Sequence, residues 1–213
     1  MKIVQKPSPN HYALSETAYL IFLHTTLGSY TGSIFHLRKK NNPSAHFVVG
    51  RQGQVAQLVS VNRGAWHAGV IKNPSAAAKL VCRKNVFGKI KNPNKYSIGI
   101  EHAAGWDIDR DGIVESWEKA FNKEMILSTA KLILHIEKET GIVFPDKHIL
   151  THKDVTSYKP DLQMQRSMVL STLNSLRGQN PPDPNPPAKK IILSEGDNVS
   201  GKVVGEKIII KKS

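Results

Sequence analysis

Ile21-Phe22-Leu23-His24-Thr25-Thr26 is a short apolar, β-prone run that brings a histidine to the end of a predicted strand. The run Ile149-Leu150-Thr151-His152 repeats this arrangement far downstream, and Asp161 follows its histidine nine residues later. Two imidazoles and one carboxylate, with a fourth position left for water, are a ligand set of catalytic zinc. Either histidine alone, in a chain with nine, would more often be an ordinary, partly buried side chain. Together, the two segments predict a zinc site at His24, His152 and Asp161.

Length and composition predict a globular chain with one main domain. The 213 residues are enough for a sizeable buried core and a small appendage. No apolar run is long enough to span a bilayer, so we expect no transmembrane segment. Residues 1–16 hold lysines but no continuous apolar stretch, and we therefore expect no secretory signal and synthesis in the cytoplasm. The single cysteine, Cys82, excludes an intramolecular disulfide and a cysteine-rich metal site.

Positive charge is concentrated in the first half of the chain. Residues 1–100 hold 14 Lys and Arg against one acid, Glu16, whereas residues 101–177 hold 10 against 12. A basic half of this kind is attracted to polyanions, although much of the charge also solvates the surface. Nucleic acid, acidic lipid and anionic cell-wall polymer all qualify. We rank nucleic acid low because no recognition motif is present and few aromatic residues lie among the basic ones.

Proline marks the expected domain boundary. The stretch RGQNPPDPNPPAKK at 177–190 favours an extended, semi-rigid linker. We therefore predict a main domain at 1–177, a linker at 178–188 and a tail at 189–213. The tail has two β-prone runs joined by GDNVSG and predicts a small hairpin, which is marginal in water by itself.

Apolar patterns in the main domain predict an α/β fold with a mixed central sheet flanked by helices, followed by a short β-rich tail. A hairpin is expected around Arg51-Gln52-Gly53, and a long helix at 117–140 has a stripe of apolar residues that ends before Gly141. Strands are predicted at 19–24, 46–49, 54–59, 96–102 and 147–152, and helices at 31–40, 117–140 and 164–176.

Four segments within residues 19–161 carry a family resemblance. They read IFLHTTLGSYTGSIFHL, SAHFVVGRQGQVAQLVSVNRGAWHAG, NKYSIGIEHAAG and ILTHKDVTSYKPD. In this order they resemble the zinc-dependent N-acetylmuramoyl-L-alanine amidases, whose fold is shared with amidase-type phage lysozymes and peptidoglycan recognition proteins. Each segment alone is weakly specific, whereas four in the family's order are a strong signal. The tail lies outside the resemblance.

The resemblance implies a role for each residue that matches the metal site. His24 and His152 match the two histidine ligands of zinc, and Asp161 matches the third ligand. Lys159 matches the catalytic lysine of the family, and a lysine beside a metal is placed to stabilise an oxyanion. Many members continue with Pro-Gly after the aspartate, whereas this chain continues with Leu162-Gln163, so the following loop departs from the pattern.

The resemblance also implies a general base and a substrate groove. Glu101 matches the glutamate that some members use as general base, a role for which a buried carboxylate is suited. Other members use a tyrosine at the position of Ala45, so the role falls to Glu101. Trp66 and His67 match a substrate-groove segment, with simple packing as the alternative for His67. His46 is expected either to line the groove or to be structural.

A second metal site is suggested by an acidic loop. Its spacing matches the D-x-D-x-D-G-x5-E pattern of calcium loops, with ligands at Asp107, Asp109, Asp111 and Glu118. A predicted strand precedes the loop, so it would be EF-like without being a full EF-hand. The alternative is an acidic turn that caps the helix beginning near Ser116. Zinc and, at this loop, Ca²⁺ are thus the cofactors to be tested.

The function implied is hydrolysis of the amide bond between N-acetylmuramic acid and L-alanine in peptidoglycan. The basic half, which would bind anionic cell-wall or outer-membrane polymers, favours a phage or prophage endolysin that acts on the wall after release. Two alternatives stay open. One is a cytoplasmic amidase that recycles wall fragments, and the other is a peptidoglycan-binding protein without catalysis. Binding-only relatives typically lack a zinc ligand, whereas all three are present here.

Overall fold

The structure is a computed structural model that describes residues 1–14, 16–26, 28–104, 121–158 and 163–179. The predicted hairpin tail lies outside these ranges, as does the predicted linker except for residues 178 and 179, and the domain boundary at 177 stays a prediction. Helix α6 continues to Gln179, two residues past that boundary.

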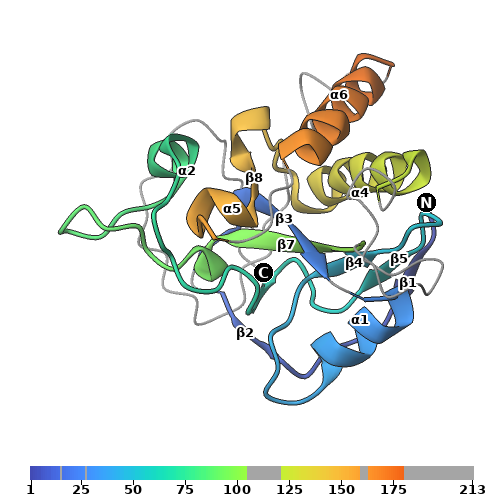
Figure 1. The fold of residues 1–213 in the computed structure, drawn as a ribbon, viewed down its shortest axis with the longest axis horizontal. Coiled ribbons are helices and arrows are strands. Elements are labelled where there is room, and N and C mark those ends of the chain that lie inside the picture. The colour runs from blue at the N-terminus through green and yellow to red at the C-terminus, as the bar shows by residue number, and fades with distance from the viewer. Residues whose placement is uncertain (15, 27, 105–120, 159–162, 180–213) are drawn as a thin grey trace, which may run out of the picture.

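A six-stranded mixed sheet forms the centre of the molecule (Figure 1). Its strand order is β1-β5-β4-β7-β3-β8, and every neighbouring pair is parallel except the β4–β5 hairpin. The strands are β1 (Ile3–Gln5), β3 (Leu20–Thr26), β4 (Phe47–Val49), β5 (Val55–Gln57), β7 (Ser97–Ala103) and β8 (Ile149–Thr151). A separate antiparallel pair joins β2 (His11–Ala13) to β6 (Arg63–Ala65). The predicted mixed sheet is confirmed.

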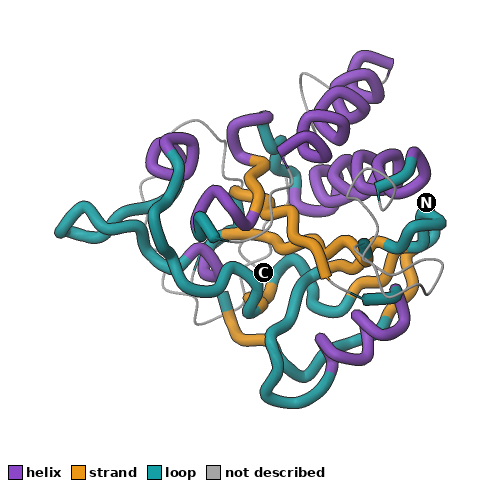
Figure 2. Tube along the Cα trace, in the orientation of Figure 1, coloured by secondary structure: helices purple, strands orange, loops and turns teal. Residues whose placement is uncertain are grey.

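Helices cover both faces of this sheet (Figure 2). Helices α4 (Lys123–Thr140) and α6 (Gln163–Gln179) pack on the face that includes Ile21 and Leu23 of β3. On the other face, α2 (Ala76–Val81) and α5 (His152–Val155) pack against Leu20 and Phe22. Helix α1 (Tyr30–Arg38) covers Val48 and neighbouring residues on that same face. Two short 3₁₀ turns, η1 (Pro93–Lys95) and η2 (Asp146–His148), precede β7 and β8.

The strand predictions are confirmed in place, with shifts of one or two residues at their ends. The apolar runs at 19–24 and 96–102 became β3 and β7, the central pair of the sheet. Both strands are buried on two faces because helices lie above and below, so nearly every residue in them is buried. The hairpin around Arg51-Gln52-Gly53 is present, and Gly53 has a φ of 75°, a conformation that side chains with a Cβ rarely adopt.

Helix α4 shows the predicted apolar stripe but starts later than expected. Met125, Leu132 and Ile133 are fully buried against the sheet. The helix starts at Lys123 because the Asn122 side chain accepts a hydrogen bond from the backbone N–H of Met125 and caps it. We predicted a helix from residue 117, but residues 121 and 122 precede the helix, so the prediction is wrong at these two residues. Gly141 ends it as predicted, with a φ of 70°.

The structure also tests the expectation about membrane spans for the part of the chain that it describes. Within those ranges, no helix combines the length and the apolar character that a bilayer crossing requires.

Candidate active site

His24 and Glu101 lie side by side at the centre of the sheet. Strands β3 and β7 are parallel with His24 opposite Glu101, and Phe22 is opposite Gly99 in the same register. Because side chains alternate along a strand, His24 and Glu101 project from the same face as Phe22. Both side chains are buried, with 1% and 9% of their surface exposed. Their nearness follows from the register alone, although 77 residues separate them in the sequence.

His152 reaches this face from the neighbouring strand in a way the sequence did not predict. We expected a strand through His152, but β8 ends at Thr151 and His152 is the first residue of α5. The cause is Asp154, whose carboxylate accepts hydrogen bonds from the backbone N–H and the hydroxyl of Thr151, at 2.8 and 2.9 Å. The second oxygen of Asp154 accepts the hydroxyl of Ser75 at 2.8 Å. These bonds turn the chain out of the strand at the histidine.

The two predicted histidine ligands meet. His24 Nδ1 and His152 Nδ1 are 3.0 Å apart, and their rings are nearly perpendicular at 80°. The backbone of Gly69, with a φ of 62°, lies against His152, and a Cβ there would be 3.4 Å from His152 Nε2. The strand order β7-β3-β8 brings the histidines together, since β8 adds to β3 on the side away from β7. The two residues are 128 positions apart in the sequence, and their role as zinc ligands stays a prediction.

A chain of hydrogen bonds behind His24 determines which of its nitrogens carries the proton. The Ser97 hydroxyl donates to the carbonyl of Pro93 at 2.7 Å, so its oxygen accepts from Nε2–H of His67 at 3.3 Å. His67 Nδ1 therefore accepts from Nε2–H of His24 at 3.0 Å. His24 Nδ1 is then left with its lone pair and faces His152. The structure thus presents His24 with an unprotonated Nδ1 directed at His152.

His67 is held firmly within the fold. It is 5% exposed, and its ring lies on Gly99, where a Cβ would be 2.4 Å from the imidazole. The Asn94 side chain accepts the backbone N–H groups of His67 and Ala68, at 3.0 and 2.7 Å. Burial is the main cause that lowers the pKa of His67 well below 6.5, and the nearby His46 adds to it. His67 is therefore neutral, as the hydrogen-bond chain requires, and its substrate contact stays a prediction.

His46 and Trp66 differ in whether they have atoms available to contact a substrate. His46 is fully buried; its Nε2–H donates to the carbonyl of Arg63 at 2.9 Å, and its Nδ1 accepts the N–H of Gly99 at 3.0 Å. Both ring nitrogens are thus used within the fold. Trp66 is 48% exposed and packs on Tyr12 with ring centroids 4.5 Å apart. Of the two, Trp66 is the one with surface to offer a substrate.

His102 is a residue that sequence reasoning passed over. It lies next to Glu101 on β7 but points to the opposite face, as strand alternation requires. Its Nδ1–H donates to the backbone carbonyl of His24 at 2.8 Å, and Nε2 is 2.9 Å from the Thr129 hydroxyl on α4. Burial lowers the pKa of His102 to about 4, so it is neutral. His102 ties the backbone of the site to the long helix, and no signal in the sequence indicated this contact.

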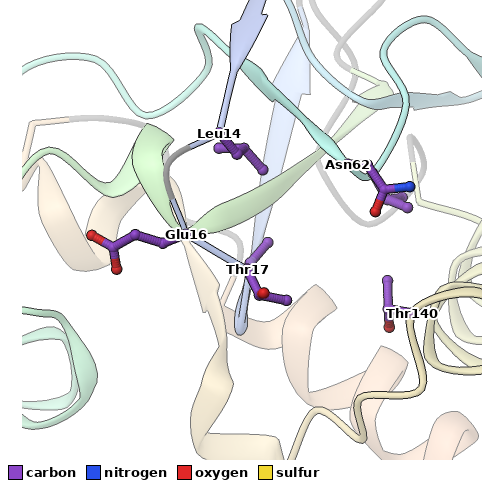
Figure 3. A pocket seen from close by; sticks show the side chains of 7 residues that line it. Leu14, Glu16, Thr17, Asn62 and Thr140 are labelled. Carbon is purple, nitrogen blue, oxygen red and sulfur yellow. The ribbon is translucent and has the colours of Figure 1, made fainter. Parts of the chain in front are cut away.

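Two hollows lie on the described part of the molecule, neither of them lined by the histidine pair. One of about 210 Å³ is lined by residues around the carboxyl ends of β3 and β7, among them Gly28, Tyr30, Arg51 and Ala103. Another of about 410 Å³ lies before the start of β3 and is lined by Leu14, Glu16, Thr17, Ala18, Val61, Asn62 and Thr140 (Figure 3). Neither hollow is lined by His24, His152 or Glu101. The site is therefore defined by the side chains described above and not by either hollow.

Several predicted site residues fall outside the described ranges. They are Lys159, Asp161 and the calcium-loop residues Asp107, Asp109, Asp111 and Glu118. Among the residues that the structure does describe, no group of three His, Cys, Asp or Glu side chains is arranged to hold a metal ion. The described part of the site is the pair His24–His152 with Glu101 beside it.

The sequence matches a known protein family over most of its length. The family described as N-acetylmuramoyl-L-alanine amidase matches residues 15–163. N-acetylmuramoyl-L-alanine amidase A of Achromobacter lyticus is 32% identical over 137 residues, which are 63% of this chain and 60% of that protein. The chain thus spans somewhat less than two thirds of this curated relative.

Solved structures share the fold. A mutant endolysin from Bacillus subtilis is similar with a TM-score of 0.55 and 18% identity, over 81% of this chain and 99% of that one. The N-acetylmuramyl-L-alanine amidase AmiD from E. coli, in complex with anhydro-N-acetylmuramic acid-L-Ala-D-gamma-Glu-L-Lys, is similar with a TM-score of 0.51 and 22% identity. That match covers 72% of this chain and 58% of the other. At these identities the likeness concerns the architecture.

Proposed function

Because the chain belongs to the N-acetylmuramoyl-L-alanine amidase family, we propose that it hydrolyses the amide bond between N-acetylmuramic acid and L-alanine in peptidoglycan. The observation that carries this proposal is the pair of Nδ1 atoms of His24 and His152, 3.0 Å apart. Glu101, opposite His24 in the strand register, adds a buried carboxylate to the same face. The curated relative supports the same reaction.

We propose zinc as the cofactor, with His24, His152 and Asp161 as its ligands. Two nitrogens bound to one tetrahedral zinc at about 2.0 Å are roughly 3.3 Å apart, so the observed 3.0 Å fits two ligands of one ion. The hydrogen bonds behind His24 leave the lone pair on the atom that faces His152. Asp161, outside the described residues, enters this proposal through the family resemblance and its spacing from His152. Zinc, when bound, supplies Lewis acidity that polarises a carbonyl and lowers the pKa of water.

The residues of the chain divide the remaining work. Glu101 accepts a proton from the attacking water as the oxygen–carbon bond forms, and gives it to the amine nitrogen as the carbon–nitrogen bond breaks. Lys159, where the motif places it, stabilises the negative charge on the carbonyl oxygen. Trp66 offers its exposed ring to the substrate. His67 and His102 position His24 from its ring and from its backbone carbonyl.

Incubation with purified peptidoglycan tests the reaction directly. We expect stem peptides with a free L-alanine amino group, detected by mass spectrometry of the released material. A chelator should stop the release and added zinc should restore it. Release of glycan fragments with the peptides still attached would contradict the proposed bond. Release that is insensitive to chelation would contradict the metal.

We further propose that the protein acts as a phage or prophage endolysin, on the wall after release from the cytoplasm. The support is the basic half of the chain, with 14 Lys and Arg against Glu16 in residues 1–100, which suits anionic wall or outer-membrane polymers. A cytoplasmic amidase that recycles wall fragments is the alternative, since the fold that the chain shares with the Bacillus subtilis endolysin and with AmiD of E. coli does not separate these roles. An endolysin should hydrolyse intact walls, whereas a recycling enzyme should prefer soluble muropeptides.

A further inference from the structure

A short hairpin at Arg83–Lys91 projects from the molecule beyond the amidase site. It follows α2 and extends away from the other described segments, at the left of Figure 1. Its tip carries Val86 and Phe87, which are 93% and 83% exposed. Neither side chain belongs to the cores of the sheet, so the tip does not contribute to their packing. Two adjacent apolar side chains at the end of a projection call for a partner.

The tip is built by a defined turn. The Asn85 side chain accepts the backbone N–H groups of Phe87 and Lys89, each at 3.0 Å. Gly88 has a φ of 73°, and its N–H donates to the carbonyl of Asn85 at 3.0 Å. The two arms are joined by the bond from Asn85 N–H to the Lys89 carbonyl and by a bridge between Lys84 and Ile90. The apolar pair is therefore held in place at the end of an ordered loop.

The base of the hairpin is anchored to the main body. Cys82 is buried among residues under the sheet, and Ile90 packs against the same cluster. Arg83 forms an ion pair with Glu16 and lies over the ring of Tyr19, 5.2 Å from its centroid. The Tyr96 hydroxyl donates to the carbonyl of Lys91 at 2.9 Å. These contacts fix the base of the hairpin to the sheet.

Positive charge surrounds the apolar tip. Lys84, Lys89 and Lys91 are exposed on the arms, and Lys79 is exposed on α2 just before them. The sequence has no Asp or Glu between Glu16 and Glu101, so no acidic residue of that stretch offsets this charge. Apolar side chains at the tip with lysines behind them match the two layers of an anionic bilayer surface, acyl chains below and phosphate headgroups above.

We propose that the Arg83–Lys91 hairpin docks the protein on an anionic lipid bilayer, with Val86 and Phe87 inserted at the interface and the lysines on the headgroups. A protein partner fits less well, because a stable interface buries about 800 Å² per side in a complementary surface, far more than two side chains at a convex tip. A bilayer needs no matching pocket. A wall polymer would use the lysines but has no layer to take up the apolar pair.

Vesicle sedimentation with the full chain tests the proposal. The probes are vesicles of phosphatidylcholine alone and with about a third phosphatidylglycerol, at low and moderate salt. We expect binding only to the anionic vesicles. V86S/F87S should reduce the partition coefficient about tenfold or more, whereas F35S, which replaces a phenylalanine on α1 that is 73% exposed, should leave it unchanged. Circular dichroism melting should show both variants folded.

Two double variants distinguish the effect of charge on the hairpin from the effect of the net charge of the molecule. K84Q/K89Q and K39Q/K40Q remove the same charge, but the first pair lies on the hairpin and the second follows α1. We expect K84Q/K89Q to weaken vesicle binding by about tenfold or more and K39Q/K40Q to weaken it by much less. Equal effects of the two pairs, with V86S/F87S binding like the natural sequence, would overturn the proposal. Binding to soluble wall polyanions but not to vesicles would also overturn it. Hydrolysis of soluble muropeptides by every variant reports separately on the amidase.

Discussion

The histidine cluster and the hairpin tip reverse the usual distribution of side chains. His24, His46 and His102 are at most 1% exposed, whereas Val86 and Phe87 are more than 80% exposed. A buried imidazole is tolerated because each ring nitrogen that the structure describes in His46 and His102 has a hydrogen-bond partner. Val86 and Phe87 are not part of the hydrophobic cores of the sheet, so packing there does not offset their exposure. The buried histidines are thus explained by hydrogen bonds, and the exposed apolar pair by the bilayer contact that we propose.

The largest expected effect on activity comes from replacing one of the two facing histidines. His24→Ala or His152→Ala should reduce peptidoglycan hydrolysis to background and reduce bound zinc from about one ion per chain to none, because a nitrogen ligand is lost. Release assays together with elemental analysis of the purified proteins measure both quantities. His36→Ala, which changes an exposed histidine on α1, serves as the control. A variant at His24 with full zinc content would refute this ligand assignment.

Glu101→Gln separates metal binding from proton transfer. The amide keeps the shape of the carboxylate but cannot take up the proton of water, so turnover should fall by about 10²- to 10⁴-fold. Zinc content should stay near that of the natural sequence, since Glu101 is not a proposed ligand. Steady-state rates on purified peptidoglycan and elemental analysis provide the two readouts. A rate close to the natural one would show that another group serves as the base.

His67→Ala examines the hydrogen-bond chain behind His24. Loss of the partner of a metal-ligating histidine typically weakens metal affinity by about 10- to 100-fold. Competition with a chromophoric chelator measures this change. NMR of the metal-free protein gives a readout that packing alone would not change: the proton on Nε2 of His24 in the natural sequence, and a mixture of tautomers in the variant. Ser97→Ala, one step further along the chain, should have a smaller effect in the same direction.

The buried His46 should make the fold sensitive to acid. Burial lowers its pKa from 6.5 to about 4, so the unfolded chain binds this proton at a higher pH than the folded one. Its full contribution to stability is present above about pH 6.5 and is lost as the pH falls toward 4. Between pH 7.5 and 5 the natural sequence should lose about 2 kcal/mol more unfolding free energy than His46→Gln. Urea unfolding with a chelator present tests this, and parallel pH profiles of the two proteins would contradict it.

Local patterns in the sequence were sufficient to predict the strands that carry His24 and Glu101. The apolar runs ending near His24 and Glu101 indicated β3 and β7, and the stripe ending before Gly141 indicated α4. The start of α4 was predicted at residue 117, before the observed start at Lys123. Apolar spacing does not show that the Asn122 side chain caps the helix there. His152 was placed in a strand because its neighbours are β-prone. The side chain of Asp154, not strand propensity, decides the turn there.

Contacts across the sheet were beyond the reach of those patterns. Nothing in the sequence near His67 or His102 indicates that one bonds the ring of His24 and the other its backbone carbonyl. Such contacts depend on the register between strands that are distant in the chain. The hairpin at Arg83–Lys91 was likewise absent from the predicted elements. Its turn is made by the side chain of Asn85.

The sequence by itself indicated His24, His152 and the strands β3 and β7 through residue type and short-range periodicity, and the family resemblance added Glu101. The tertiary structure alone decided that His24 presents Nδ1, that His152 begins a helix facing it, and that His102 supports it from the opposite face. Hydrogen-bond directions depend on positions to within a fraction of an ångström. Those positions are fixed only when strand register and packing bring distant segments together.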